Sequence, residues 1–145
     1  MQFDILPWQI IHIHPLLFGS RMFAAPPFVN LLVIRSPDID RAVAFYQQMG
    51  ILFERHAHGK GPEHYASENC GFVFEIYPQR NEEKATTNTR FGFNVAEVDV
   101  VVALLSEIDA TIVVEATDTE WGRRAVVKDF DGHIVELVTP LNRVE

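Results

Sequence analysis

The chain has 145 residues, of which 48% are hydrophobic and 22% are charged, and this composition predicts one globular domain with a real apolar core. A formal net charge of −8 argues against nucleic acid as a partner, because binding to a phosphate backbone needs a basic face. The single cysteine, Cys70, excludes an intrachain disulfide and fits a reducing compartment, so we expect a cytoplasmic protein.

The first 27 residues differ in pattern from the rest. Their apolar run, 8–18, is interrupted by His12 and His14, is too short to span a membrane, and follows no basic segment. We therefore expect no membrane association and interpret residues 1–27 as an extension outside the fold. Two histidines alone make a weak metal site, so none is assigned to this pair.

The remaining chain shows one pattern twice, strand–helix–strand–strand–strand. In the first copy, about residues 28–78, a strand over 28–35 precedes a helix that Ser36 caps and Gly50 ends. The same copy continues with three predicted strands, over 51–57, 63–67 and 71–77.

The second copy covers about residues 89–140, and a short tail, 141–145, follows it. It begins with a strand over 90–95 and a helix over 98–108, whose apolar residues fall on one stripe. Three strands complete it, over 111–116, 121–128 and 132–138. Each copy is too small to bury its apolar face alone, so the two must pack together.

Each copy ends in a strand with a lone carboxylate in its middle, Glu75 in the first and Glu136 in the second. Side chains alternate along a strand, so the flanking apolar residues turn toward the helices and the glutamates turn to the other face. A carboxylate is costly in a sealed core. We therefore expect each glutamate to face a cavity, a cation or a partner.

Three segments carry a family resemblance: Ala44-Phe45-Tyr46 in the first helix, Trp121-Gly122-Arg123-Arg124, and the Asp-Phe-Asp-Gly-His-Ile-Val-Glu-Leu run over 129–137. With the duplicated pattern, they resemble the vicinal-oxygen-chelate superfamily, which includes glyoxalase I, bleomycin-resistance proteins and extradiol dioxygenases. The resemblance covers about 28–140. It implies an α+β fold of two βαβββ modules with cupped mixed sheets, and a homodimer. Activity does not follow, since one scaffold hosts many chemistries.

In metal-using members of that family, each module supplies one ligand from its first strand, usually histidine, and one from its last, usually glutamate. Glu75 and Glu136 match the last-strand places, whereas the first-strand places align to Leu31 and Arg90. Two carboxylates without imidazole suit zinc, nickel or iron poorly, so we expect no metal cofactor. We expect Arg90 to stand where a metal would and to neutralise one or both glutamates.

His64 is the histidine nearest to this arrangement. If Glu68 pairs with Gly71 across the turn, His64 lies directly opposite Glu75 on the same face. A displaced divalent-metal site from Glu75, Glu136 and His64 is then one alternative, and a His64–Glu75 acid/base pair is another. A plain cross-strand polar pair at the rim is the third.

The sequence thus favours a protein that binds a small organic molecule without metal, similar to the bleomycin-resistance group. The ligand-binding candidates combine a cation, an amide, an apolar side chain and two aromatic rings: Arg90, Asn94, Leu31, Tyr77 and Trp121. Two alternatives stay open. One is a metal-dependent enzyme resembling glyoxalase I, and the other is a metal-free enzyme that uses His64 and Glu75.

Overall fold

The computed structural model describes residues 27–81 and 84–141. The first module contains β1 (Leu31–Ser36), α1 (Ile39–Gln47), β2 (Glu54–His56), β3 (His64–Asn69) and β4 (Phe72–Pro78). The second contains β5 (Arg90–Asn94), α2 (Val98–Glu107), β6 (Thr111–Thr119), β7 (Gly122–Lys128) and β8 (Ile134–Pro140). The predicted pair of βαβββ modules is confirmed. The predictions for 1–26 and 142–145, including those for His12 and His14, lie outside the described residues.

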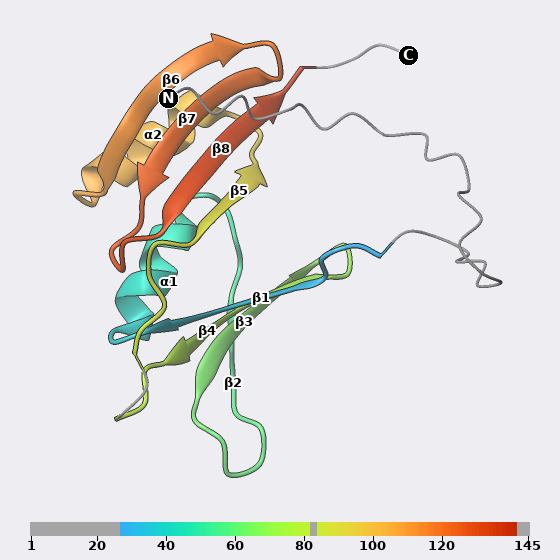
Figure 1. Cartoon of the computed structure of the whole chain (residues 1–145), viewed down its shortest axis with the longest axis vertical. Helices are drawn as coiled ribbons and strands as arrows, with labels where there is room; N and C mark the ends of the chain where they lie inside the picture. Colours follow the sequence, from blue (N-terminus) through green and yellow to red (C-terminus); the bar gives the residue numbers. More distant parts are fainter. Residues whose placement is uncertain (1–26, 82–83, 142–145) are drawn as a thin grey trace, which may run out of the picture.

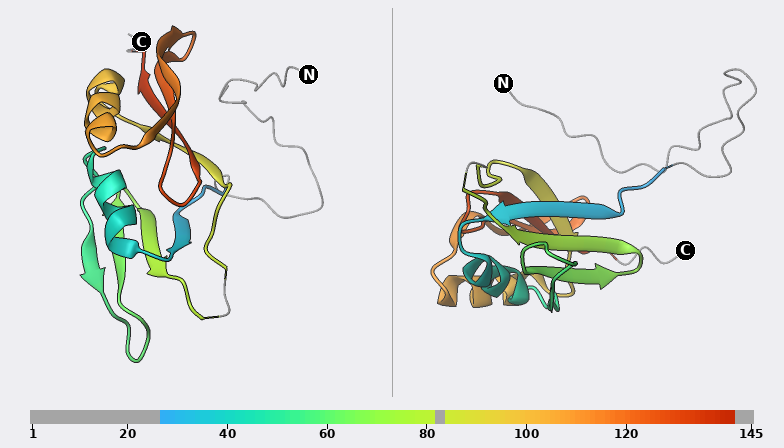
Figure 2. Two further views of the ribbon diagram at one scale, coloured as in Figure 1. Left: turned by 90° about the vertical axis from the view of Figure 1, so that its left-hand side faces the viewer. Right: turned by 90° about the horizontal axis from the view of Figure 1, so that it is seen from below.

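The two modules form two four-stranded mixed sheets, in the orders β1-β4-β3-β2 and β5-β8-β7-β6 (Figure 1). In each sheet the first strand runs parallel to the last, and the other neighbours are antiparallel. Both helices lie on the same side of the molecule, so each sheet has one face covered by its helix (Figure 2). We call the opposite faces the open faces. No helix within the described ranges is long and apolar enough to cross a membrane.

The last strand of each module lies between the first strand and the third. Glu75 on β4 therefore pairs with Val33 on β1, and Glu136 on β8 pairs with Gly92 on β5. The neighbours of each glutamate along the strand are buried toward the helix, as the alternation predicted. The two glutamates thus occupy equivalent places on the open faces.

The first helix begins later than predicted. Asp38, not Ser36, is the N-cap, and its carboxylate accepts a hydrogen bond from the backbone N–H of Arg41 at 3.0 Å. Ser36 instead ends β1, where its carbonyl accepts from the backbone N–H of Gln79. Pro37 favours this outcome, because a residue before proline is driven toward extended backbone.

The hairpin between β3 and β4 also differs from the prediction. Its two turn residues are Cys70 and Gly71, with φ of 52° and 78°, as a type I′ turn requires. Ala66, and not His64, therefore lies directly opposite Glu75. The shift amounts to two residues along the strand, so His64 keeps the predicted face and reaches Glu75 diagonally.

Three strand boundaries were wrong because a strand extends only where a partner pairs with it. The first strand begins at Leu31 rather than 28, since its register with β4 starts at the Leu31–Val73 pair, and Phe28 is exposed. The predicted strand over 51–57 pairs with β3 only through Glu54–His56. The predicted loop over 117–120 belongs mostly to β6, which pairs with β7 as far as Thr119.

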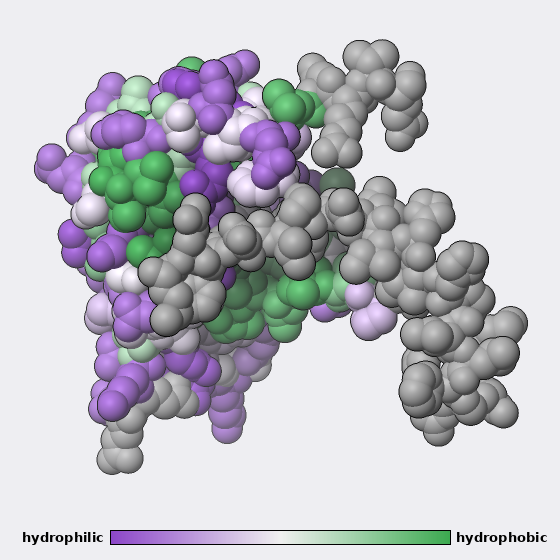
Figure 3. Space-filling model, turned by 45° about the horizontal axis from the view of Figure 1, so that its top comes forward, coloured by the Kyte–Doolittle hydropathy of each residue, from purple (hydrophilic) through white to green (hydrophobic). Residues whose placement is uncertain are grey.

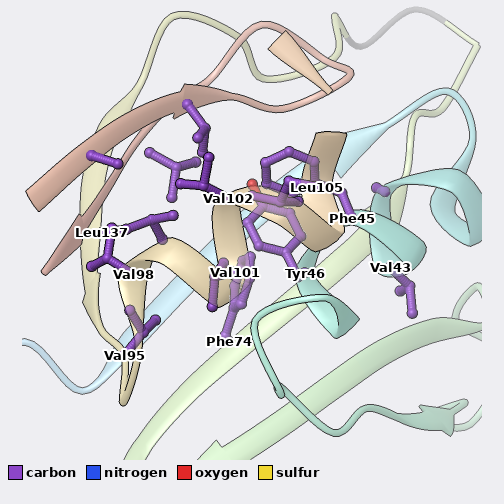
Figure 4. Packing of buried hydrophobic residues seen from close by; sticks show 14 of the residues in the cluster. Val43, Phe45, Tyr46, Phe74, Val95, Val98, Val101, Val102, Leu105 and Leu137 are labelled. Carbon is purple, nitrogen blue, oxygen red and sulfur yellow. The ribbon is translucent and has the colours of Figure 1, made fainter. Parts of the chain in front are cut away.

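Tyr46 on α1 lies at the centre of the core shared by the modules (Figure 4). Its ring packs on Phe74 from β4 and on Phe91 and Phe93 from β5, with ring centroids 4.9–6.3 Å apart. Its hydroxyl donates to Asp129 Oδ2 at 2.5 Å, in the loop before β8. Burial raises the pKa of Tyr46 well above its ordinary value, and the charge of Asp129 adds to this effect. This hydrogen bond ties the first module to the second.

Replacing Tyr46 by phenylalanine should lower the free energy of unfolding by about 1–3 kcal/mol, because a buried carboxylate loses a donor. Tyr65→Phe is the matched control, since the Tyr65 hydroxyl donates to Asp40 at 2.6 Å in an exposed position. We expect it to cost less than about 1 kcal/mol. Urea unfolding followed by circular dichroism measures both. If both variants lose the same free energy of unfolding, the buried Tyr46–Asp129 hydrogen bond contributes no more to stability than the exposed Tyr65–Asp40 one.

Candidate functional site on the open faces

Glu136 is held by two guanidinium groups. Arg90 Nε donates to Glu136 Oε1 at 2.6 Å, and Arg90 Nη2 approaches the same oxygen. Arg124 donates to Oε2 from Nε at 3.0 Å and from Nη2 at 3.0 Å. Gly92, opposite Glu136, has no side chain; a Cβ there would lie 3.3 Å from Glu136 Cβ. The predicted contact of Arg90 with Glu136 is thus present, and Arg124 completes it.

This cluster carries an excess positive charge. Two guanidinium charges face one carboxylate, so one positive charge is not balanced within the cluster. Burial alone would raise the pKa of Glu136, but hydrogen bonds from Arg124 and Arg90, with the charges of these residues, outweigh it and lower that pKa. Arg124 and Glu136 are mostly buried, whereas half of the Arg90 side chain is exposed. Arg90 is therefore the member that a ligand reaches first.

Glu75 has different neighbours at the equivalent positions of the first module. On β1, Val33 pairs with Glu75, and Leu31 lies two residues before Val33. The equivalent position on β5, two residues before Gly92, holds Arg90. On β3, Ala66 pairs with Glu75, and His64 lies two residues before Ala66. The equivalent position on β7, two residues before Val126, holds Arg124. His64 Nε2 lies 3.8 Å from Glu75 Oε1, too far for a hydrogen bond. No contact between Arg90 and Glu75 occurs within the described part of the chain.

The other predicted ligand-binding residues are not gathered in one place. Tyr77 lies on the open face beside His64, and the two rings stack with centroids 4.0 Å apart. Leu31 is about half exposed on the same face. Asn94 ends β5 and borders a cavity between the modules. Trp121 lies in the β6–β7 turn, between Thr119 and Gly122, and its side chain is partly exposed.

Sequence reasoning missed Arg124 as a site residue and missed the cavity altogether. The cavity has a volume of about 680 Å³ and is lined by residues of both modules. Its lining combines apolar side chains, such as Met49, Leu52, Phe72 and Phe93, with polar ones, which are Ser67, Glu68, Asn69 and Asn94. The signal for Arg124 was its place in the strand alternation, which puts it on the same face as Val126 and Lys128 and opposite to Ala125 and Val127. The cavity had no such signal, because three distant segments form it.

Within 27–81 and 84–141, no group of three or more histidine, cysteine, aspartate or glutamate side chains is arranged to hold a metal ion. Glu136 in particular has both oxygens engaged by guanidinium groups. A cation brought to Glu136 would have to displace an arginine and face the charge of the other.

Changing Glu136 to glutamine should destabilise the fold by about 1–2 kcal/mol at pH 7, because two partly buried guanidinium groups lose their counter-charge. Since folding lowers the pKa of Glu136, its contribution is present above the unfolded pKa of about 4.3 and is lost as pH falls through the folded value. The difference between wild type and Glu136→Gln should therefore vanish in acid. Urea unfolding between pH 7 and pH 3 tests this, with exposed Glu68→Gln as control. A difference that is as large at pH 3 as at pH 7 would contradict it.

Comparison with known proteins agrees with this architecture. The model of the Glyoxalase/Bleomycin resistance protein/Dioxygenase superfamily matches residues 28–137. A search among curated proteins found no match. Among solved structures, TnmS3, an antibiotic binding protein from Streptomyces sp. CB03234, has 20% identity and a TM-score of 0.64, with 81% of this chain and 99% of that chain covered.

Two further structures have the same fold. TioX from Micromonospora sp. ML1 has 21% identity and a TM-score of 0.60, with 79% of this chain and 100% of TioX covered. A glyoxalase/bleomycin resistance protein/dioxygenase family enzyme from Burkholderia phytofirmans PsJN has 19% identity and a TM-score of 0.60, with 77% and 98% covered. The chain therefore belongs to the Glyoxalase/Bleomycin resistance protein/Dioxygenase superfamily.

Proposed function

We propose that this protein binds a small organic molecule on its open faces and holds it without chemical conversion, similar to bleomycin-resistance proteins. The observation that carries the proposal is the Arg90–Glu136–Arg124 cluster, which offers an excess positive charge at an exposed guanidinium. The printed description of TnmS3 as an antibiotic binding protein supports a binding role for this scaffold. A cytoplasmic location fits the exposed free thiol of Cys70.

The ligand is bound without a metal in this proposal. Of the four places that supply metal ligands in the family, Leu31 and Arg90 occupy the first-strand pair, and neither side chain coordinates a metal. The oxygens of Glu136 are already taken by Arg90 and Arg124. These residues therefore do not fit the family's metal, and Arg90 supplies the positive charge in its place.

The character of the ligand follows from the surroundings of the cluster. A guanidinium with spare hydrogen-bonding capacity favours a carboxylate or a similar acid group. Leu31 and Val33 expose apolar surface on the open face of the first sheet, and the cavity beside Asn94 includes the aromatic rings of Phe72 and Phe93. An aromatic acid combines both features.

A homodimer is the second part of the proposal. Apolar side chains are exposed on both open faces, among them Leu31, Val33 and Val114, and Figure 3 shows hydrophobic areas among polar ones on the surface. The charged residues on the open face of the first sheet are mainly acidic, and those on the second mainly basic: Glu54, Glu68, Glu75 and Arg35 against Arg90, Arg124, Lys128 and Glu136. In a dimer with twofold symmetry, the acidic open face of each copy would lie against the basic open face of the other copy, so the same favourable contact would form at two places.

One observation favours an enzyme instead. His64 is buried, and its Nε2 lies 3.8 Å from Glu75 Oε1, so a histidine and a carboxylate of the kinds that act as acid and base are neighbours. The glyoxalase I-like alternative and the metal-free alternative are separated by one assay, turnover of a glutathione hemithioacetal with and without nickel or zinc. Metal-dependent turnover that His64→Ala abolishes would replace the binding proposal with the glyoxalase I-like one. Metal-free turnover lost in the same variant would favour the His64–Glu75 enzyme.

An aromatic carboxylate should bind more tightly than its neutral amide in the presence of EDTA. We expect 2-naphthoate to be preferred over 2-naphthamide by about tenfold, the size of one charge-assisted hydrogen bond. Arg90→Gln should remove this preference, whereas Arg55→Gln, which changes an exposed arginine near Asp40 and Glu63, should keep it. Isothermal titration calorimetry measures the affinities. No binding of either probe, or equal affinities in wild type, would count against the proposal.

The dimer should be visible as a solution mass of twice the 16.5 kDa chain. Replacing Leu31 and Val33 together by glutamine should shift the mass toward one chain, because it removes apolar surface from the interface. Val100→Gln is the control, since Val100 is 56% exposed but lies on α2. Light scattering after gel filtration gives the masses. A wild-type monomer at micromolar concentration would refute this arrangement.

A further inference from the structure

The outer edge of β5 carries backbone groups that point away from the sheet. β5 is an edge strand, and within the described part of the chain its one strand neighbour is β8. The backbone N–H of Val95 donates to the carbonyl of Val138 in β8, so Val95 turns its backbone toward that strand. Backbone groups alternate in direction along a strand, so those of Gly92 and Asn94 point to the opposite side.

These outward groups form a ready hydrogen-bonding edge. No described residue makes a backbone hydrogen bond to the outward groups of Gly92 or Asn94. The carbonyl of Gly92 and the N–H of Asn94 follow each other along the edge, so they present an acceptor and a donor side by side. Gly92 also leaves its backbone uncovered, because it has no side chain. A partner with a matching donor and acceptor can therefore pair with this edge.

The same edge borders the cavity between the modules. Residues 92–95 form one side of the cavity, and residues 49–52, residues 67–69, Phe72 and Phe74 form the other. Its volume of about 680 Å³ lies in the range of small-molecule pockets. Neither Glu75 nor Glu136 lines it, and neither arginine of the Glu136 cluster does. The cavity is therefore a place separate from the two glutamates.

The lining favours an uncharged aromatic molecule. Three aromatic rings line the cavity, with one hydroxyl and two carboxamide side chains: Phe72, Phe74, Phe93, Ser67, Asn69 and Asn94. Among the described residues no lysine, arginine or histidine lines it, and Glu68 is its one charged residue. An acid would therefore find no counter-charge in this place. A neutral ring system with its own hydrogen-bonding groups would find partners for both parts.

We propose that the cavity binds a flat aromatic lactam, whose amide group pairs with the outer edge of β5. The ligand N–H donates to the carbonyl of Gly92, and the ligand carbonyl accepts from the backbone N–H of Asn94. Its rings lie between the modules, against Phe72 and Phe93. This site goes beyond the acid-binding function proposed for Arg90, because it has another place and takes a neutral ligand.

The test is a calorimetric titration of the full chain with 2-quinolone and with N-methyl-2-quinolone. The methyl group removes the N–H donor and keeps the carbonyl and the rings, so it should weaken binding by at least about tenfold. Asn94→Pro removes the backbone donor and should cost a similar factor, since an edge strand accepts proline where its N–H points outward. Asn94→Ala, which keeps the N–H, should cost less than about threefold.

A variant that fills the cavity separates this site from the open faces. Ser67→Phe should abolish binding of 2-quinolone, whereas Ser106→Phe, the same change at an exposed position on α2, should keep it. Ser67→Phe should also keep the preference for 2-naphthoate over 2-naphthamide. Loss of that preference alone in wild type would count against the Arg90 proposal and would leave the lactam site supported.

Three results would overturn the lactam site. The first is no binding of 2-quinolone at about 1 mM, or equal affinities for the two quinolones. The second is binding that Arg90→Gln weakens as much as Ser67→Phe does, because the lactam would then lie on an open face. The third is an affinity that falls as protein concentration rises, since a second copy would then occupy the edge. Circular dichroism reports folding, and if Asn94→Pro fails to fold, the N-methyl comparison still decides.

Discussion

The position of the last strand in each sheet is the constraint on which the candidate site depends. Because β4 and β8 lie between the first and third strands, a side chain in their middle meets neighbours on both sides. A carboxylate placed there, partly removed from water, requires a positive partner from one of those neighbours. Glu136 obtains two, from β5 and β7. Glu75 has, among the described residues, the imidazole of His64 as a neighbour, with Nε2 at 3.8 Å from Glu75 Oε1.

The two modules therefore differ in chemistry on equivalent backbones. Two substitutions account for most of the difference: Leu31 against Arg90, and His64 against Arg124. The second module holds its glutamate between two guanidinium groups, whereas the first places Glu75 beside an imidazole. A duplicated scaffold can thus carry different side-chain chemistry without any change in strand order.

The aromatic core and the glutamate clusters lie on opposite faces of the sheets. The helix-covered faces carry the aromatic core around Tyr46, whose hydroxyl joins α1 to Asp129 in the second module. The open faces carry the charged residues and some exposed apolar side chains, which contribute little to that core. The cavity between the modules lies where the two regions meet, since Phe74 from the core and Asn94 both line it.

The sequence by itself determined the two modules, the face of each glutamate and the place of Arg90 beside Glu136. These features follow from the alternation of side chains along each strand, which is a local property of the sequence, and from a motif that occurs twice at a fixed spacing. Only the tertiary structure decided the rest. Arg124 reaches Glu136 diagonally. His64 does not lie directly opposite Glu75 as predicted, because Cys70 and Gly71, both with positive φ, form the two-residue turn and so set the register of the hairpin. Such contacts depend on hairpin register and side-chain reach, and the cavity depends on segments that meet only when the modules pack.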